Sequence, residues 1–377
     1  MRKTYKYKLY SSKKNKALAQ QINIAAGIWN HSIALHRRYY RLFHKSLNKY
    51  HLQKHTAKLK KRDKYKHWNL VGSQCIQDIS DRIDKSYKLF FHNLKTGVKT
   101  APPKFCSYKK YKSVTFKQAG WKLLEGKKIR IGKKVYKYSK SREIEGCVKT
   151  VTVKRDSLGD FYLYFSCELA DVNPSRVMTG KSAGADFGLK TFLTFNDGTE
   201  EKSPLFFNQN AKALAVASRN VSSKKRGSNN RAKAVKNLGR VHQRTANQRK
   251  DYHFKLAGRL AKNLDYLFLE TLNMKSMQML WGRKVSDLGF SEFVGILHHQ
   301  ASKTDCTIQH IGKYFPSSKM CGACGVVNKS LSLADRKWTC VCGSTHNRDE
   351  LAANNIFREG ASSLGLGDVR ALVPIPA

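Results

Sequence analysis

The sequence predicts an α+β fold built from several domains, and three observations lead to this prediction. The 377 residues are enough for two or three domains, and a hydrophobic content of 41% can fill their cores. Apolar residues recur at helical spacing over the first hundred residues, whereas residues 113–169 alternate as strands do. After Pro174 short strands and helices follow one another, and a cysteine-rich segment interrupts them.

The first domain is expected to be mostly helical. One long amphipathic helix is predicted by a spacing of three or four, doubled once, along Leu18, Ile22, Ala25, Trp29, Ile33, Tyr40 and Phe43. A second helix is predicted by the same spacing along Cys75, Ile79, Ile83, Tyr87, Phe90 and Leu94. We expect this helix to end near Thr100, because Pro102 and Pro103 cannot continue it.

The next region is expected to be a small β-barrel or sandwich. β-Branched and aromatic residues alternate over residues 148–153 and 161–165, on either side of a turn at 157–159. A linker is predicted near residues 172–180. Beyond it, strands are expected at 183–187 and 191–195, with a hairpin turn at 196–198, and later at 266–269 and around 306–311.

Positive charge dominates the chain. Lys and Arg total 72 against 26 acids, a formal net charge of +46, so a large polyanion is the expected partner. We expect no membrane partner, because no apolar run reaches the roughly 18 residues of a spanning helix and no signal peptide opens the chain. A cytoplasmic location is therefore expected.

The basic residues concentrate in one segment. Residues 219–250 carry eleven Lys or Arg and no acid. Such a segment is either a solvated basic surface or a pair of helices that contacts phosphates. In the second interpretation the candidate nucleic-acid contacts are Lys224, Lys225, Arg226 and Arg231.

Four of the nine cysteines form a metal-binding pattern. Cys321 and Cys324 are separated by two residues, and fifteen residues later Cys340 and Cys342 are separated by one. This spacing is close to that of a structural zinc ribbon, and without an export signal metal is favoured over disulfides. The second pair is one residue shorter than usual, so His346 is a conceivable substitute ligand.

Three acids stand at unusual positions. Asp186 follows the apolar strand 183–185, and Glu270 follows the apolar strand 266–269. A carboxylate at the end of a buried strand is costly unless a cation compensates it, and converging carboxylates suit Mg²⁺. Such acids also pair with lysines in ordinary proteins. Asp349 begins a helix, where Asn347 and Glu350 equally form a capping box.

Four blocks of the sequence resemble the TnpB family of transposon proteins, the ancestors of type V CRISPR effectors. They are Gly184-Ala-Asp186-Phe-Gly-Leu-Lys, Leu269-Glu270-Thr-Leu-Asn-Met, Phe315-Pro-Ser-Ser-Lys-Met-Cys-Gly-Ala-Cys324-Gly and Cys342-Gly-Ser-Thr-His-Asn-Arg-Asp349-Glu-Leu-Ala-Ala-Asn-Asn-Ile356. The resemblance covers nearly the whole second half of the chain. A weaker similarity includes Ser73-Gln-Cys-Ile-Gln77 and Phe116-Lys-Gln118.

The resemblance implies an RNA-guided DNA endonuclease with a RuvC-like, RNase H-like site. Asp186, Glu270 and Asp349 would hold two Mg²⁺ ions, and one structural Zn²⁺ would sit in the ribbon. A transposon-derived guide RNA and a double-stranded DNA target would be the partners of a monomer. Gln77 and Gln118 match positions near the contact with a short motif flanking the target, although each is equally compatible with a plain surface residue.

The same resemblance predicts the order of domains. We expect a first strand of the β-barrel, or wedge, domain at 1–12, a helical recognition domain at 13–110 and the rest of the wedge domain at 111–175. The nuclease would occupy 176–314 and 346–377, with the zinc ribbon inserted at 315–345 as a domain that binds target nucleic acid. A transposase acting directly on transposon ends, or a regulator that binds without cleaving, is the alternative.

The chain departs from the family pattern at two positions. The family usually has Asp-Arg-Asp followed by Asn two residues later, but this chain has Asn347-Arg348-Asp349 and then Leu351. The second acid, which is the one the family uses, is present. A supporting role of the first acid and of that Asn is therefore in doubt.

Overall fold

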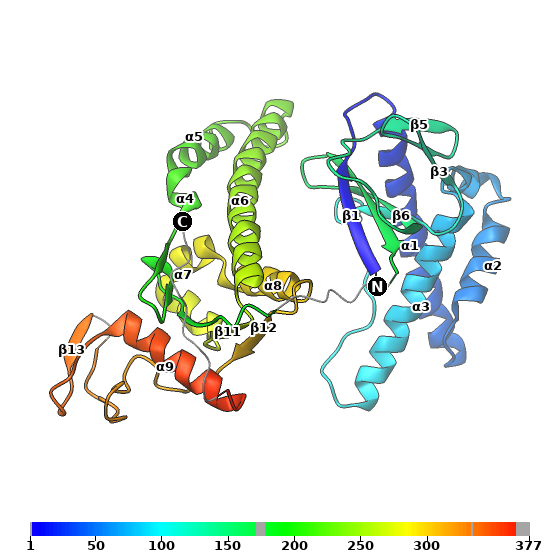
Figure 1. Cartoon of the computed structure of the whole chain (residues 1–377). Helices are drawn as coiled ribbons and strands as arrows, with labels where there is room; N and C mark the ends of the chain where they lie inside the picture. The colour runs from blue at the N-terminus through cyan, green and yellow to red at the C-terminus, as the bar shows by residue number, and fades with distance from the viewer. Residues whose placement is uncertain (1, 171–177, 333–334, 367–377) are drawn as a thin grey trace. The chain divides into compact units, whose positions relative to one another are not determined.

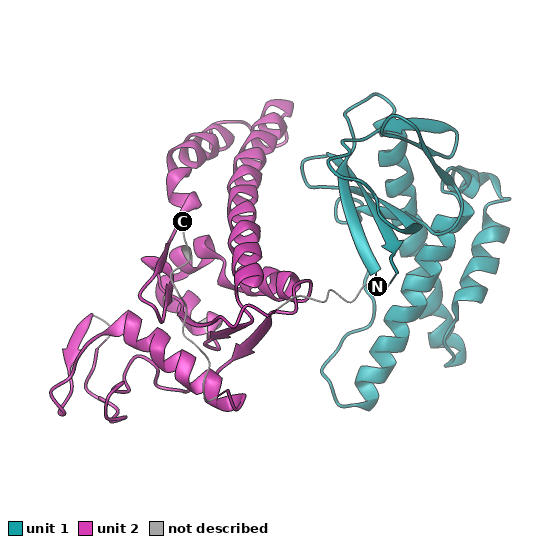
Figure 2. Ribbon diagram, viewed as in Figure 1, with its two compact units in different colours: residues 1–172 teal, residues 173–377 magenta. Residues whose placement is uncertain are grey.

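The computed structural model describes residues 2–170, 178–332 and 335–366, and these form two compact units (Figure 2). Unit 1 covers Met1–Val172 and unit 2 covers Asn173–Ala377. Most of the linker predicted at 172–180 lies outside the described residues, since these resume at Met178. The two units are described separately below.

Unit 1 contains the two predicted helices and, between them along the chain, two helical segments that were not predicted. They are α1 (Asn15–Phe43), α2 (Lys49–Leu59), the 3₁₀ helix η1 (Asp63–Leu70) and α3 (Ser73–Lys95), as Figure 1 shows. Helix α3 ends five residues earlier than predicted. The reason is Gly97, whose φ of 72° leaves the helical region before the two prolines are reached.

The predicted apolar face of the helices is only partly buried. Leu18, Ile22 and Ile83 are almost inaccessible in the core of unit 1. At the other end of the pattern the expectation of burial was wrong, because Tyr40 and Phe43 are 46% and 57% exposed and Leu94 is 53% exposed. Tyr40 and Leu94 line a cavity between the last turns of α1 and α3, where the packing is not closed.

The strands of unit 1 form two small antiparallel sheets. The first has the order β1-β7-β6-β2, from β1 (Arg2–Lys8), β2 (Ser113–Phe116), β6 (Cys147–Arg155) and β7 (Phe161–Glu168). The second is the meander β3 (Trp121–Leu124), β4 (Lys128–Ile131) and β5 (Lys134–Lys137). A bridge between Leu9 and Tyr138 joins the two sheets, so the predicted β-rich region is present as two joined antiparallel sheets.

Unit 2 is built on a five-stranded sheet with the order β10-β9-β8-β11-β12. The strands are β8 (Ser182–Asp186), β9 (Thr191–Phe195), β10 (Glu200–Lys202), β11 (Tyr266–Leu269) and β12 (Thr307–His310). β8, β11 and β12 are parallel, whereas β9 and β10 run antiparallel to their neighbours. The strands predicted from the sequence are confirmed within one or two residues at each end.

Helices cover both faces of this sheet (Figure 1). On one face lie α6 (Asn229–Asn263), α7 (Met274–Leu288) and α8 (Phe290–Ala301), whose apolar residues join Ala183, Ala185 and Leu267 in one core. The other face carries α9 (Arg348–Ser363), which packs through Ile356 against Phe268. Successive residues of β8 and β11 therefore face opposite layers, as the pleat of a strand requires.

Two further parts complete unit 2. Helices α4 (Phe206–Gln209) and α5 (Ala211–Ser222) precede α6. A short hairpin of β13 (Lys337–Thr339) and β14 (Thr345–Asn347) leads into α9 and belongs to the cysteine-rich segment. Over the described ranges 2–170, 178–332 and 335–366, none of the helices is both long and apolar enough to cross a membrane.

Candidate functional site

The sheet of unit 2 brings two of the predicted acids to the same edge. β8 and β11 are parallel neighbours, and Ala185 lies opposite Leu269 in their register. The next residue on each strand is Asp186 and Glu270, so the two carboxylates lie beside each other at the carboxyl ends of the strands. This edge of an open parallel sheet is where ligands usually bind.

Burial makes both carboxyl groups hard to ionise. Burial raises the pKa of Asp186 well above its ordinary value, and the charges of Glu270 and Asp349 raise it further. Burial also raises the pKa of Glu270 to about 7, against an opposing backbone hydrogen bond from Phe187. Paired acids with raised pKa values at a sheet edge are typical of functional sites, because the energy needed to bury their charge is recovered when a cation binds.

Helix α9 supplies the third acid, and two glycines decide where it lies. A Cβ atom on Gly184 of β8 would come within 2.5 Å of the Ala353 carbonyl oxygen and 2.6 Å of the Phe357 nitrogen. A Cβ atom on Gly360 of α9 would overlap the ring of Phe268. The helix therefore rests directly on β8 and β11, and its first turn carries Asp349 toward the edge where these strands end.

Two arginines balance the charge of this acidic cluster. The Arg336 guanidinium donates to both carboxylate oxygens of Asp349, at 3.1 and 2.7 Å. The positive charge of Arg348 opposes the rise of the pKa of Asp186. Among the described residues, the four clustered cysteines are the group of at least three ligands whose atoms all lie within 4.8 Å of one another.

The start of α9 shows what the two departures from the family pattern do. Asn347 is the N-cap, because its Oδ1 accepts a hydrogen bond from the Asp349 backbone N–H at 3.3 Å and its Nδ2 donates to Glu350 at 2.9 Å. Leu351 is buried in a small core with Leu331 and Trp338 of the cysteine-rich segment. Both residues thus have structural roles in joining this segment to the helix.

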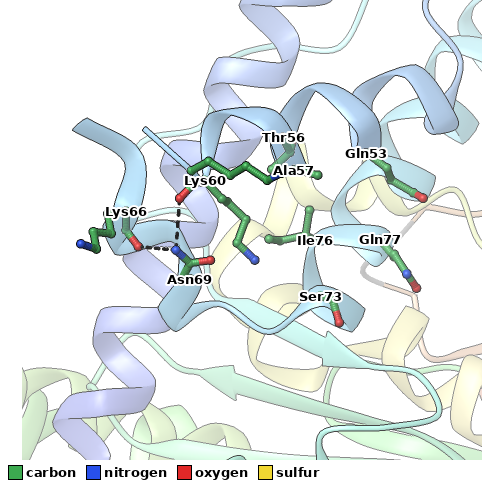
Figure 3. Close-up of a pocket in the computed structure, with 10 residues that line it drawn as sticks. Gln53, Thr56, Ala57, Lys60, Lys66, Asn69, Ser73, Ile76 and Gln77 are labelled. Atoms are coloured by element: carbon green, nitrogen blue, oxygen red, sulfur yellow. Dashed lines mark hydrogen bonds between the residues drawn. The ribbon is translucent and has the colours of Figure 1, made fainter. Parts of the chain in front are cut away.

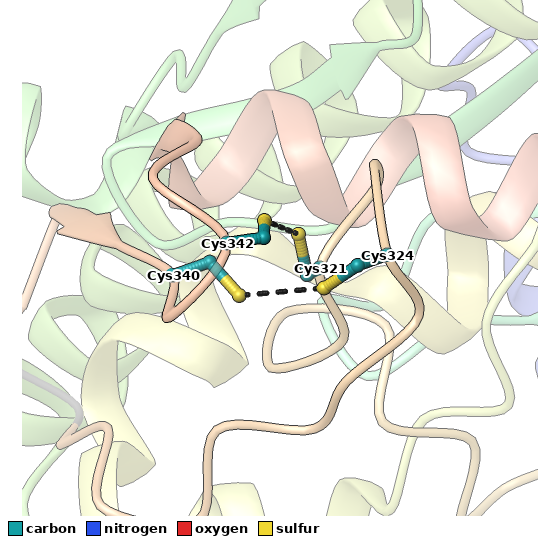
Figure 4. A group of neighbouring side chains, drawn as sticks. All are labelled: Cys321, Cys324, Cys340 and Cys342. Carbon is teal, nitrogen blue, oxygen red and sulfur yellow. Dashed lines mark hydrogen bonds between the residues drawn. The ribbon is translucent and has the colours of Figure 1, made fainter.

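The cysteine-rich segment holds a compact group of four sulfur atoms (Figure 4). Sγ of Cys321 lies 3.7 Å from that of Cys342, and Sγ of Cys324 lies 3.6 Å from that of Cys340. Tetrahedral zinc with Zn–S bonds of about 2.3 Å places its sulfur ligands about 3.8 Å apart. The geometry therefore fits one ion of this kind.

Polar neighbours prepare this group for metal. The hydroxyl and backbone N–H of Ser344 lower the pKa of Cys342 to about 6, which favours the thiolate that binds metal. Nε2 of His346 lies 3.1 Å from Sγ of Cys321. His346 is thus a neighbour of a set of four cysteines, and the short spacing of the second pair does not displace Cys342 from it.

The cysteine-rich segment is also tied to α9. Nδ2 of the buried Asn355 donates to the carbonyl oxygens of Ser317 at 2.7 Å and Met320 at 2.8 Å. Arg358 donates to the Gly322 carbonyl oxygen. Movement of the segment would therefore move the helix that carries Asp349.

Unit 1 contains the two glutamines matched to the flanking-motif contact. Gln77 lines a cavity of about 670 Å³ between α2, η1 and α3, together with Lys60, Lys66 and Asn69 (Figure 3). The exposed Gln118 is close by, since its backbone N–H bonds Gln74, one turn before Gln77 on α3, at 3.4 Å. The structure therefore brings both predicted residues to one basic side of the helical domain.

The four basic candidates of unit 2 fall into two groups. Lys224, Lys225 and Arg226 are exposed in the turn between α5 and α6 and are available to phosphates. Arg231 is different, because its guanidinium donates to the carbonyl oxygens of Val221 at 2.9 Å and Lys224 at 3.2 Å. Arg231 therefore stabilises the turn, and the other three basic residues project from this turn into solvent.

Sequence reasoning missed the contributions of Gly184 and Arg336. Gly184 stands inside a quoted motif, and a glycine within a strand is a signal of close backbone approach that could have found it. Arg336 stands four residues before Cys340 with no pattern around it. Its pairing with Asp349 depends on how the hairpin folds back, which local spacing does not indicate.

Comparison with known families supports this picture. A family model described as a probable transposase matches residues 164–280, and one described as the TNB domain of Cas12f1-like proteins matches residues 290–356. The first covers β8, α6 and β11 with their acids. The second covers the four cysteines and Asp349.

Three relatives show the same similarity. A protein of Streptomyces pristinaespiralis named "Putative RNA-guided DNA endonuclease" is 34% identical over 58% of this chain, which spans about half of that protein, 54% of its length. One of Escherichia coli, with the same name and the suffix InsQ, is 28% identical over 79% of this chain and 77% of its own length. A protein of Acanthamoeba polyphaga mimivirus named TnpB-like is 28% identical over 59% of this chain and 46% of its own length.

A solved structure shares the fold. It is a chain of a Cas12f1–sgRNA–target DNA complex studied by cryo-EM, with a TM-score of 0.58, 16% sequence identity and coverage of 92% of this chain and 83% of that chain. At this identity the comparison shows the fold alone.

Proposed function

Since this chain belongs to the TnpB family, we propose that it is an RNA-guided DNA endonuclease that cuts DNA with Asp186, Glu270 and Asp349 in the presence of Mg²⁺. The observation that carries the proposal is the register of β8 and β11, which puts Asp186 and Glu270 side by side at one sheet edge. The electrostatic influence of Asp349 on Asp186 adds the third acid.

The residues fit a hard divalent cation. Three carboxylates supply only oxygen donors, and the raised pKa values of Asp186 and Glu270 mean that a cation would be needed to keep both ionised near neutral pH. When bound, Mg²⁺ lowers the pKa of a coordinated water, and its positive charge stabilises the phosphate in the transition state. Asp186 and Glu270 would hold it from the ends of β8 and β11. Asp349 would hold it from the first turn of α9.

Arg336 is expected to change partners in this scheme. In the structure its guanidinium covers both oxygens of Asp349. Before Asp349 can serve as a ligand, this ion pair has to open. The freed guanidinium would then be next to the site, where phosphate is the available anion.

The cysteine cluster is proposed to hold one structural Zn²⁺. Cys321, Cys324, Cys340 and Cys342 leave no open position, which is the mark of a structural site. Its role is to fix the segment against which Leu351 and Asn355 hold α9. Zinc would therefore act on cleavage indirectly, through the placement of Asp349.

The basic residues are proposed to bind a guide RNA and double-stranded target DNA in the cytoplasm, at the nucleoid. Lys224, Lys225 and Arg226 would contact phosphates, and Gln77 and Gln118 would lie near the motif beside the target. In RNA-guided enzymes base pairing selects the sequence while the protein reads only a short flanking motif. A net charge of +46 is consistent with both polyanions.

The test is cleavage by the full chain with RNA purified from its native locus. Wild type should cut a plasmid that carries the complementary target when Mg²⁺ is present, and Asp186→Asn should not cut at all. Asp197→Asn is the matched control, because Asp197 lies in the nearby hairpin turn, outside the acidic edge. Its Oδ1 accepts hydrogen bonds from the backbone N–H and the hydroxyl of Thr199. Asp186→Asn should retain RNA affinity, since binding depends on many basic residues.

Three outcomes would contradict the proposal. One is cleavage by Asp186→Asn in Mg²⁺, and another is wild-type cleavage without RNA. The third is joining of transposon ends in place of cutting, which would assign the same acids to a transposase.

A further inference from the structure

A second cavity of unit 1 lies apart from the glutamine side. It measures about 390 Å³ and opens between the last turns of α1 and α3. Its lining consists of His36, Arg37, Tyr40, Tyr87, Phe90, Phe91, Leu94 and Pro102. A volume of this size is within the range of sites for small planar ligands.

Aromatic rings make up most of the wall. The imidazole of His36 stacks on the ring of Tyr87 with centroids 3.6 Å apart and planes 7° apart. Phe91 continues the row, at 6.3 Å from Tyr87 and 5.2 Å from Phe90. A wall of this kind offers flat π faces, on which another ring can stack.

The mouth of the cavity is apolar but exposed to solvent. Tyr40 and Leu94, which the helical pattern predicts as buried, are 46% and 53% exposed there. Phe105, whose ring lies under the Arg37 guanidinium, is likewise exposed, at 55%. Exposed apolar groups that adjoin one another around a cavity mark a binding surface more often than a chance pattern.

The charge of the lining is positive. Arg37 is exposed at the mouth, where its guanidinium donates to the Pro103 carbonyl oxygen at 2.9 Å and lies 4.8 Å from the centre of the Phe105 ring. No acid is among the described residues that line the cavity. The buried Asp84 behind it is paired with Lys88 at 3.0 Å. The occupant is therefore expected to combine a flat ring with a negative charge.

Two polar atoms of the wall, Nε2 of His36 and the hydroxyl of Tyr87, have no hydrogen-bond partner among the described residues. Both atoms are buried. The His36 side chain is only 2% exposed. A buried polar atom without a partner costs about 1–3 kcal/mol, and native proteins rarely leave one unexplained. A ligand with hydrogen-bonding groups on its edge would satisfy them after a small shift of the stacked rings.

We propose that this cavity receives one unpaired nucleobase of the bound RNA, with the phosphate of that nucleotide on Arg37. A base provides the flat ring and the polar edge, and its phosphate provides the negative charge. Paired bases inside a duplex cannot enter, but RNA loops and bulges expose bases that stack on aromatic side chains. The inference rests on the proposed function only in taking RNA as the partner.

The test measures binding of a short RNA by the full chain carrying Asp186→Asn. The probe is a single-stranded RNA of about ten nucleotides with one fluorescent 2-aminopurine, a length comparable to the sites of other single-strand binders. Tyr40→Ala should weaken binding by about tenfold and reduce the quenching of 2-aminopurine. Tyr40→Phe, which keeps the ring, should restore both. Tyr50→Ala is the control, because Tyr50 is 67% exposed on α2, outside the lining.

The results separate this inference from the nuclease. Equal RNA affinities of Tyr40→Ala and Tyr50→Ala would contradict base binding in the cavity. They would not bear on the proposed nuclease activity. If Tyr40→Ala weakened the binding of a DNA strand of the same sequence as much as it weakened RNA binding, the assignment to RNA would be wrong. A wild type that dimerises where Tyr40→Ala does not would assign the surface to a second copy of the chain. Failure to cut DNA would leave the binding result standing, since the assay needs no cleavage.

Discussion

The cysteine cluster and the carboxylate site both border the first turns of α9, but they are built in opposite ways. The four sulfur atoms lie within 4.8 Å of one another on loops of one segment. The three acids come from two strand ends and a helix, and one of them, Asp349, is paired with Arg336. The thiols gather within one short segment, whereas the acids come together only because two strands and a helix from distant parts of the sequence pack on one another.

The two sites also affect the stability of the folded state in opposite directions. A preassembled set of ligands stabilises the native state when it binds metal. The half-buried acids do the reverse, because their raised pKa values mean that ionising them costs free energy in the folded chain. We therefore expect the cysteines, with metal bound, to stabilise the folded state, and the ionised carboxylates, without metal, to destabilise it.

The largest expected effect tests the first half of the comparison. Cys321→Ser should lose zinc and unfold the ribbon, because zinc contributes ~10–16 kcal/mol to the folding of zinc-finger peptides. Metal analysis and protease sensitivity around residues 315–345 measure this. Cys306→Ser is the matched control, since Cys306 is buried in the core of unit 2 away from the cluster. Active, soluble protein without zinc would contradict the structural role.

The next prediction concerns the contact that places Asp349. Gly184→Ala should lower the free energy of unfolding by about 1–3 kcal/mol, because the new Cβ would meet the backbone of α9. Cleavage should fall as Asp349 shifts. Gly258→Ala is a control of the opposite sign, because Gly258 is helical, has open space around it, and alanine favours the helix. Equal stability of Gly184→Ala and wild type would show that α9 moves freely.

A pH titration tests the second half. The folded-state pKa of Glu270 is about 7, above the ordinary value of 4.5, so the folded chain holds this proton more tightly than the unfolded chain. The metal-free protein should therefore lose stability as pH rises from about 4.5 to 7. Glu270→Gln should flatten part of this slope in denaturant melts at several pH values. A slope identical to that of wild type would show that Glu270 ionises normally.

A smaller effect is expected from Arg336. Arg336→Gln should strengthen Mg²⁺ binding about two- to fivefold, since an exposed ion pair contributes about 0.2–1 kcal/mol and its loss frees Asp349. Calorimetry of Mg²⁺ binding measures this independently of cleavage. Lys337→Gln removes the neighbouring exposed charge and is the control. Weaker Mg²⁺ binding by Arg336→Gln alone would mean that the arginine positions Asp349 for metal.

Much of the fold could be predicted because its signals are local. The strands that end in Asp186 and Glu270 and the spacing of the cysteines are all visible in short windows of sequence. The Tyr40 end of α1 was mispredicted for the opposite reason. Helical spacing shows which residues share a face, but burial depends on how closely a neighbouring element packs on that face. Here α1 and α3 leave a cavity between them, which Tyr40 and Leu94 line.

The candidate site divides in the same way. The sequence indicates which acids are candidates, because a carboxylate after an apolar strand is unusual wherever it occurs. It does not indicate that Arg336 would pair with Asp349, because that contact joins a hairpin to a helix. Contacts made by folding of the chain onto itself leave no periodicity to detect.

A similarly small effect is expected at Asn347, where the stabilising and the catalytic sides of the comparison meet. Its Oδ1 caps α9 and its Nδ2 bonds Glu350. Asn347→Ala should therefore lower the free energy of unfolding by about 1 kcal/mol, and Asn347→Asp, which keeps the cap and loses only the exposed bond to Glu350, should lower it less. Because the cap is structural, Asn347→Asp should also leave cleavage at low Mg²⁺ unchanged. Thermal melts and cleavage over a range of Mg²⁺ concentrations measure the two properties separately. A several-fold gain in low-Mg²⁺ cleavage from Asn347→Asp would show instead that this position belongs to the carboxylate site and that the chain works below the capacity of its family.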